Sequence, residues 1–177
     1  MPSPIIKRLY DENKLLINKL LAEGEISLVA TIDDILRKTL LMSAASYFEH
    51  TISESILEYV AEIADNDTAV ISLVKAKAIE RQYHTYFSWD SSNANSFFGY
   101  FGEKYKIYAK EIVEQDPDLK ESIRAFLELG SLRNQLVHKD YANFPLEKTA
   151  DEIYHLYLVA IRFVDFFPGS LRDFSRK

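Results

Sequence analysis

The hydrophobic residues of this chain recur every three or four positions along most of its length, which is the spacing of one face of an α-helix. The longest such run lies between residues 32 and 64 and predicts one long helix. Its apolar positions are Leu36, Leu40, Ala44, Phe48, Ile52, Ile56, Val60 and Ile63. The alternation of apolar and polar residues that is typical of a strand never extends beyond a few residues. The pattern therefore predicts an all-α fold.

Turn-forming residues divide the chain into about five to six predicted helices. The proline after Ser3 suits the start of a first helix, which Gly24 would stop after about residue 21. Further helices are predicted over residues 67–81, 96–115, 119–138 and 147–167, with an aromatic-rich loop over residues 82–96. Pro168 would end the last helix. No internal repeat or domain boundary is visible, so residues 1–177 are expected to form a single domain, an antiparallel helical bundle.

The composition narrows the possible chemistry. The chain has no cysteine, which excludes disulfides, zinc–thiolate sites and cysteine nucleophiles and fits a reducing compartment. Neither a secretory leader nor a long apolar run is visible, so we expect a cytoplasmic protein without membrane contact. Residues 1–66 carry 6 basic and 11 acidic side chains, and residues 67–177 carry 15 and 16. With a net charge of −6, any nucleic-acid contact is expected to be local and to lie in the second part.

Common nucleotide-binding and hydrolase motifs are absent from the sequence. Glu152 and His155 have the Glu-x-x-His spacing of a di-iron helical bundle, but a second such pair is missing, so we expect no metal and no cofactor. His50 and Glu54 are spaced as an ordinary pair on a helix surface. Glu49 falls on the apolar side of the long helix, where a carboxylate needs a partner such as an arginine.

The segment from Arg133 to His138, with the sequence RNQLVH, places a polar cluster at the end of an otherwise apolar helix. On a regular α-helix these two residues lie about 140° apart, so they share a face only if the helix ends or tightens near Val137. Asn134 lies one turn before His138 and could fix the imidazole by a hydrogen bond. Alternatively, Arg133 is a surface residue and His138 complements the helix dipole. The spacing leaves both interpretations open.

This segment resembles the R-x4-H motif of HEPN domains, with Asn134 as the polar residue that commonly follows the arginine. A wider likeness to the RiboL-PSP-HEPN branch covers about residues 30–167. The resemblance implies a metal-independent endoribonuclease that acts as a homodimer, with Arg133 and His138 as catalytic residues and Asn134 in support. Members in toxin–antitoxin pairs carry a tyrosine two residues after the histidine, which a nucleotidyltransferase partner modifies. That position here is Asp140, with Tyr141 one place later.

Elementary chemistry supports the same reaction, because RNA supplies its own nucleophile, the 2′-OH. A histidine can transfer protons near neutral pH, and an arginine can stabilise the charge that develops on the phosphate. One histidine cannot easily act on both sides of the phosphorus, so two copies related by a two-fold axis would divide these roles. The predicted function is an RNA-cleaving toxin or anti-phage effector, with an antitoxin or defence protein as partner. The alternative is a catalytically silent dimerisation or RNA-binding module.

Contacts to the RNA substrate are predicted mainly around the motif. We assign Lys139, Tyr141 and Glu49 to substrate binding. Phosphate contacts are also conceivable at Lys75, Lys77, Arg81, Lys104, Lys106 and Lys110. Unpaired bases could stack on Tyr83, Tyr86, Phe87 and Trp89. Clustered aromatic residues more often anchor a loop on the core or on a dimer partner, and this interpretation is favoured for these rings.

Overall fold

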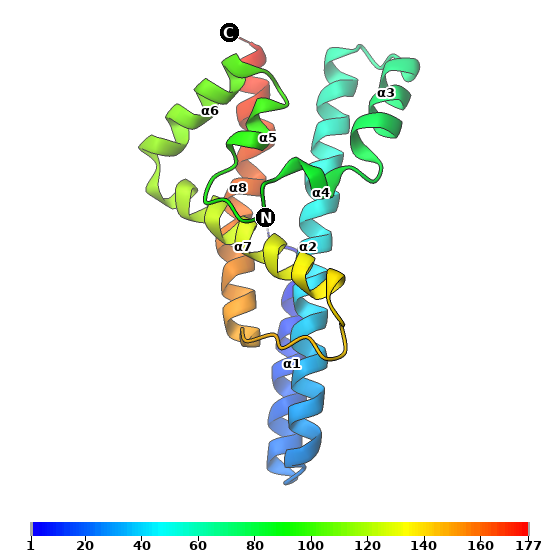
Figure 1. Cartoon of the computed structure of the whole chain (residues 1–177), viewed down its shortest axis with the longest axis vertical. Coiled ribbons are helices and arrows are strands. Elements are labelled where there is room, and N and C mark those ends of the chain that lie inside the picture. Colours follow the sequence, from blue (N-terminus) through cyan, green and yellow to red (C-terminus); the bar gives the residue numbers. More distant parts are fainter. Residues whose placement is uncertain (1, 177) are drawn as a thin grey trace.

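The computed structural model describes residues 2–176, and every regular element among them is helical (Figure 1). The elements are α1 (Pro4–Ala22), α2 (Ile26–Ile63), α3 (Thr68–Val74), the π-helical segment η1 (Lys75–Ile79), α4 (Tyr83–Tyr86), α5 (Asn95–Gly99), α6 (Glu103–Gln115), α7 (Pro117–His138) and α8 (Ala150–Ser175). The all-α prediction is confirmed. The predicted number of five to six helices is wrong, because eight α-helices lie within the described residues. None of these helices is long and apolar enough to cross a membrane.

Three long helices form the body of the molecule: α2, α7 and α8 pack on one another. Figure 1 shows α2 and α8 running in the same direction, with α7 crossing them. Rings from all three meet in the core, where Phe126 of α7 lies 5.6 Å from Phe48 and 5.0 Å from Phe163, measured between ring centroids. Each such buried phenylalanine stabilises the fold by about 1.5–3 kcal/mol. Burial of the middle of α7 therefore positions its C-terminal end relative to α2 and α8.

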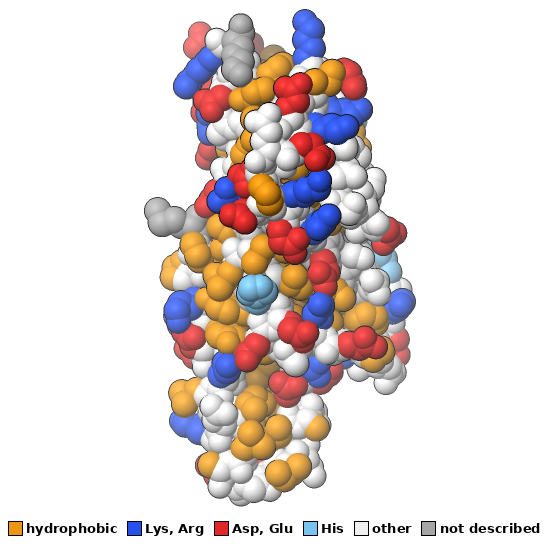
Figure 2. All heavy atoms as spheres, turned by 90° about the vertical axis from the view of Figure 1, so that its left-hand side faces the viewer, with side chains coloured by type: hydrophobic (Ala, Val, Ile, Leu, Met, Phe, Trp, Pro, Cys, Tyr) orange, Lys and Arg blue, Asp and Glu red, His pale blue; other side chains and the backbone are white. Residues whose placement is uncertain are grey.

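Helices α1 and α2 form an antiparallel hairpin that projects from this body (Figure 1). Gly24, with a φ of 77°, allows the tight turn between them, so α2 begins at residue 26 rather than at residue 32. Large apolar side chains remain exposed on the hairpin, namely Leu15, Leu16, Leu21, Ile26, Leu28 and Ile35. Figure 2 shows hydrophobic side chains gathered at this end of the molecule. The hairpin thus presents an apolar surface that nothing in the described chain covers.

The aromatic middle of the chain folds onto the core. The predicted loop over residues 82–96 contains the short helix α4, and its Tyr83, Tyr86 and Phe87 are buried. Phe87 lies 4.8 Å from Phe126, centroid to centroid. These three rings therefore anchor the segment on the core. The single helix predicted over residues 96–115 is also wrong, because Gly102, with a φ of 97°, separates α5 from α6.

Two predicted helix ends are displaced. The third predicted helix does not reach Arg81: α3 ends at Val74 and η1 continues to Ile79. The last helix does not stop before Pro168 but continues to Ser175. A proline inside a helix costs about 3 kcal/mol because it removes a hydrogen bond and crowds the preceding turn. Burial of apolar residues on both sides of the proline offsets this cost, since Phe167 before it and Leu171 after it are buried.

Candidate functional site

The RNQLVH segment lies at the C-terminal end of α7. Asp116 caps the start of this helix by accepting a hydrogen bond from the Leu119 backbone N–H at 2.9 Å. The helix stays α-helical through His138, and the extended Lys139 ends it. The helix therefore ends without tightening, so Arg133 and His138 remain about 140° apart and about 7.5 Å apart along the axis.

Arg133 is half-buried and held by two neighbours. Its Nη2 lies 3.7 Å from a carboxylate oxygen of Glu49 on α2, and its Nη1 donates to Asn134 Oδ1 at 3.0 Å. Glu49 on the apolar side of α2 therefore has an arginine as its partner, as the sequence predicted. Asn134 contacts Arg133 here, whereas the sequence interpretation paired it with His138. A guanidinium has five N–H donors, so the remaining donors can bind a phosphate.

His138 is exposed as the last residue of α7. Lys139 and Tyr141, which follow it, are exposed as well. The Lys139 ammonium lies 5.4 Å from the centroid of the Phe144 ring, and the Tyr141 ring lies 5.5 Å from the Lys38 ammonium. The end of α7 thus presents an imidazole, an ammonium and a phenol to solvent.

A small recess lies behind Arg133, and the sequence did not indicate it. Tyr83, Trp89 and Gly130 line this recess together with Arg133 and Asn134. Burial raises the pKa of Tyr83 well above its ordinary value of 10, and the nearby Glu49 carboxylate adds to the shift. The Tyr83 phenol is therefore neutral across the physiological range.

Gly130 is the residue that lets Trp89 close this recess. A Cβ atom at Gly130 would lie 1.9 Å from the indole Cζ3 of Trp89, so only glycine leaves room for the ring. The indole N–H donates to the backbone carbonyl of His84 at 2.9 Å, which joins Trp89 to α4. A glycine inside a helix costs about 1 kcal/mol relative to alanine and usually has a packing reason. That cost was the only sequence signal for this contact.

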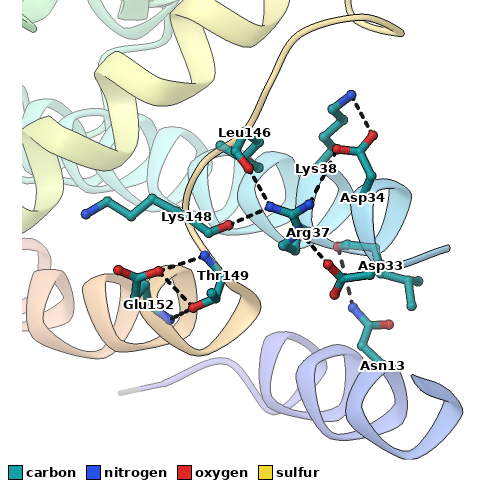
Figure 3. Close-up of polar contacts among 10 residues, drawn as sticks. Asn13, Asp33, Asp34, Arg37, Lys38, Leu146, Lys148, Thr149 and Glu152 are labelled. Atoms are coloured by element: carbon teal, nitrogen blue, oxygen red, sulfur yellow. Dashed lines mark hydrogen bonds and ion pairs between the residues drawn. The ribbon is translucent and has the colours of Figure 1, made fainter. Parts of the chain in front are cut away.

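The segment that follows α7, residues 139–149, is held against α2 by two consecutive basic residues (Figure 3). Lys38 is buried; its ammonium lies 2.7 Å from Asp34 and donates to the backbone carbonyls of Tyr141 at 3.0 Å and Ala142 at 3.3 Å. Arg37 donates to the carbonyls of Leu146 and Lys148. A charged side chain is rarely buried without such partners. These contacts fix the path of the chain immediately after His138.

Asp140 stabilises the turn within this segment. Its carboxylate accepts hydrogen bonds from the Asn143 side chain at 2.6 Å and from the Ala142 backbone N–H at 3.2 Å. The hydrogen bond from Asn143 lowers the pKa of this carboxyl below its ordinary value. The residue at this position is thus a structural carboxylate.

The Glu-x-x-His spacing on α8 has a structural explanation. Glu152 forms a capping box with Thr149: each side chain bonds the other residue's backbone N–H at the start of the helix. Figure 3 shows these contacts. No group of His, Cys, Asp or Glu residues between positions 2 and 176 is arranged to hold a metal ion.

An all-helical fold with an Arg-x4-His motif at the C-terminal end of a long helix is typical of HEPN-type proteins. The family model of RiboL-PSP-HEPN matches residues 7–173, and the chain belongs to this family. No curated protein and no solved structure matches the chain. HEPN domains are often ribonucleases.

Proposed function

We propose that this protein is a metal-independent endoribonuclease whose site combines Arg133 and His138 from two copies of the chain. The observation that carries the proposal is the contrast between the two residues. Arg133 is half-buried and oriented by Glu49 and Asn134, whereas His138 is exposed at the end of the same helix. An oriented guanidinium can stabilise the charge on the phosphate, and an accessible imidazole can transfer protons, and RNA cleavage requires both.

In the proposed reaction, the 2′-oxygen attacks the adjacent phosphorus and the bond from phosphorus to the 5′-oxygen breaks. One histidine accepts the proton of the 2′-OH, and the other donates a proton to the departing 5′-oxygen. Arg133 binds the phosphate oxygens through its planar fork as their negative charge grows. The products are a 2′,3′-cyclic phosphate and a 5′-hydroxyl.

Two copies are needed because each chain offers one histidine in the motif, and because Arg133 and His138 point about 140° apart on α7. A two-fold axis near the end of α7 would bring the second His138 to the opposite side of the phosphate. The RNA is the substrate, and the second chain completes the site.

The neighbouring residues take distinct roles in this proposal. Lys139 and Tyr141 are accessible and contact the RNA, the first by charge and the second by its ring. Glu49 acts on the substrate through Arg133, because a carboxylate held 3.7 Å from a guanidinium orients it. A cytoplasmic toxin or anti-phage effector, restrained by an antitoxin or defence protein, is the biological setting we propose.

A second candidate function is a catalytically silent interaction module. The exposed apolar side chains of the α1–α2 hairpin favour it, because contiguous apolar surface marks sites of protein association. This candidate predicts association without RNA cleavage.

The test is to incubate the purified chain with mixed single-stranded RNA in excess EDTA and to map the product ends. We expect cleavage that leaves 2′,3′-cyclic phosphates and that fails on DNA. His138→Ala should cleave more than about 100-fold more slowly than the parent. Arg133→Lys should also be inactive, because an ammonium does not reproduce the planar fork of a guanidinium. His155→Ala, at an exposed histidine on α8, is the matched control and should cut at the parent rate. Dependence on Mg²⁺ or a 3′-hydroxyl product would exclude the mechanism. Full activity of His138→Ala would exclude the site.

A mixing experiment tests the composite site separately. Equal amounts of parent and His138→Ala chains are combined and allowed to exchange subunits. If both histidines are required, about one quarter of the activity of the all-parent sample should remain, because one dimer in about four carries two intact chains. Independent sites would leave about one half.

A further inference from the structure

A cavity of about 430 Å³ lies apart from the α7 site, between α2 and the aromatic middle of the chain. Its walls come from α2, α3, η1, α4 and α5 and from the residues after α5. The aromatic members are Tyr59, Tyr86, Phe97, Tyr100 and Phe101. The volume falls within the range of small-molecule sites, about 300–1,000 Å³.

The hydroxyl groups of the cavity walls are already engaged within the protein. Tyr86 donates to the Ala78 carbonyl, Tyr100 donates to the Thr85 carbonyl at 3.1 Å, and the Tyr59 hydroxyl pairs with Ser175 at 2.6 Å. Apart from Gln82 and Lys77, the walls therefore offer mainly ring faces and aliphatic groups to an occupant. Such a surface favours a flat apolar molecule, which stacks on the rings without leaving polar groups unpaired.

Lys77 adds a positive charge to the lining of this cavity. It is exposed and forms no ion pair with any described residue. It lies in η1, a π-helical segment, and π-helical turns are often found at functional sites. The backbone then turns at Arg81, where a φ of 63° is uncommon for a side chain other than glycine. Charge complementarity to Lys77 favours an occupant with one anionic group.

Helix α4 connects the cavity with the α7 site. Tyr86 faces the cavity, and Tyr83 lines the recess behind Arg133. Their ring centroids are 5.8 Å apart. The His84 carbonyl between them accepts the indole N–H of Trp89, which also lines the recess.

We propose that the cavity binds a planar, apolar molecule that carries one anionic group, and that its occupant acts on the Arg133 recess through α4. Binding at the cavity does not depend on RNA cleavage. The coupling to the Arg133 recess can also be measured without RNA cleavage. It rests on the proposed function only in that a change at the recess would alter ribonuclease activity.

The test uses 2-naphthoate as the probe and calorimetry on the full chain. We expect saturable binding of one molecule per chain, and about fivefold weaker binding in Lys77→Glu. Lys75→Glu, in the same π-helical segment but outside the lining, should bind as the parent does. The uncharged 2-naphthamide should bind weakly and should not respond to Lys77→Glu. Absence of saturable naphthoate binding up to millimolar concentration would overturn the proposal, as would equal binding by the two lysine variants.

A second pair of variants tests the position of the probe. Val74→Phe places a ring in the cavity and should abolish binding, whereas Leu73→Phe, at the exposed neighbouring position, should not. Coupling is read from the Trp89 indole N–H signal in a ¹⁵N–¹H spectrum, which needs no assignment because the chain has one tryptophan. This signal should shift and saturate together with naphthoate binding. Binding without a shift would refute the coupling to the Arg133 recess. Neither result depends on whether the protein cleaves RNA.

Discussion

Replacing Gly130 with alanine tests the packing behind Arg133. The new Cβ would lie 1.9 Å and 2.1 Å from two carbons of the Trp89 ring, far inside van der Waals contact. The ring can move only by giving up packing contacts, because Tyr83, Phe87 and Phe126 surround it with centroid distances of 5.9, 5.1 and 6.0 Å. Overpacking of this kind costs about 1–3 kcal/mol. Loss of the indole hydrogen bond to the His84 carbonyl would add about 0.5–1.5 kcal/mol.

The substitution also gains about 1 kcal/mol of helix propensity, so the net expectation is a destabilisation of about 0.5–3.5 kcal/mol. For a chain of this size that corresponds to a Tm lower by about 1–14 °C. Gly169→Ala is the matched control, because it also lies inside a helix but its new Cβ would meet nothing within 4 Å. Alanine there should raise the Tm by about 2–4 °C.

The assay is thermal unfolding followed by circular dichroism, with the emission of Trp89, the chain's one tryptophan, as a local probe. Gly130→Ala should shift this emission to longer wavelength as the ring is displaced toward solvent. Gly169→Ala should leave the emission unchanged. If both variants raise the Tm by similar amounts, the contact between Gly130 and Trp89 does not constrain the fold and the reasoning fails.

Three further predictions concern other parts of the structure. In a urea titration, Lys38→Met should lower the free energy of unfolding by about 1–3 kcal/mol, because two backbone carbonyls and Asp34 lose a buried donor. The control Lys14→Met, which removes an exposed ion pair with Asp151, should lower it by less than about 1 kcal/mol. Hydrogen bonding to Arg162 lowers the pKa of Asp116 below its ordinary value of 3.8, so its stabilising contribution is present above that pH and is lost as the pH falls through the lower, folded-state pKa. The urea midpoint of Asp116→Asn should therefore fall less steeply than that of the parent as the pH drops below about 4. The same pH dependence in both proteins would contradict this account. Cells that express the parent chain should grow slowly, whereas cells that express folded Arg133→Ala or His138→Ala should grow normally. Slow growth with both variants would show that toxicity does not depend on these two residues.

Local sequence signals located much of the fold and of the candidate site. Helical periodicity and turn-forming residues predicted the existence of α2, α3 and α7, with their starts placed within a few residues. The position of Glu49 on an apolar helix face indicated a basic partner, which proved to be Arg133. These features depend on residues a few positions apart, so the sequence carries them directly.

Features that depend on distant partners could not be read from the sequence. Pro168 is a local stop signal, yet α8 continues because Phe167 and Leu171 are buried on other helices. Lys38 looks like an ordinary surface lysine, but the chain after α7 returns to it and buries it.

The sequence by itself determined the helical class, the family motif and the end of the helix that carries it. Only the tertiary structure decided which group faces Arg133, how Trp89 packs on Gly130 and where a cavity opens beside α4. The physical reason is that periodicity tells which face of a helix seeks burial, whereas the partner of that face is chosen by packing among residues far apart in the chain.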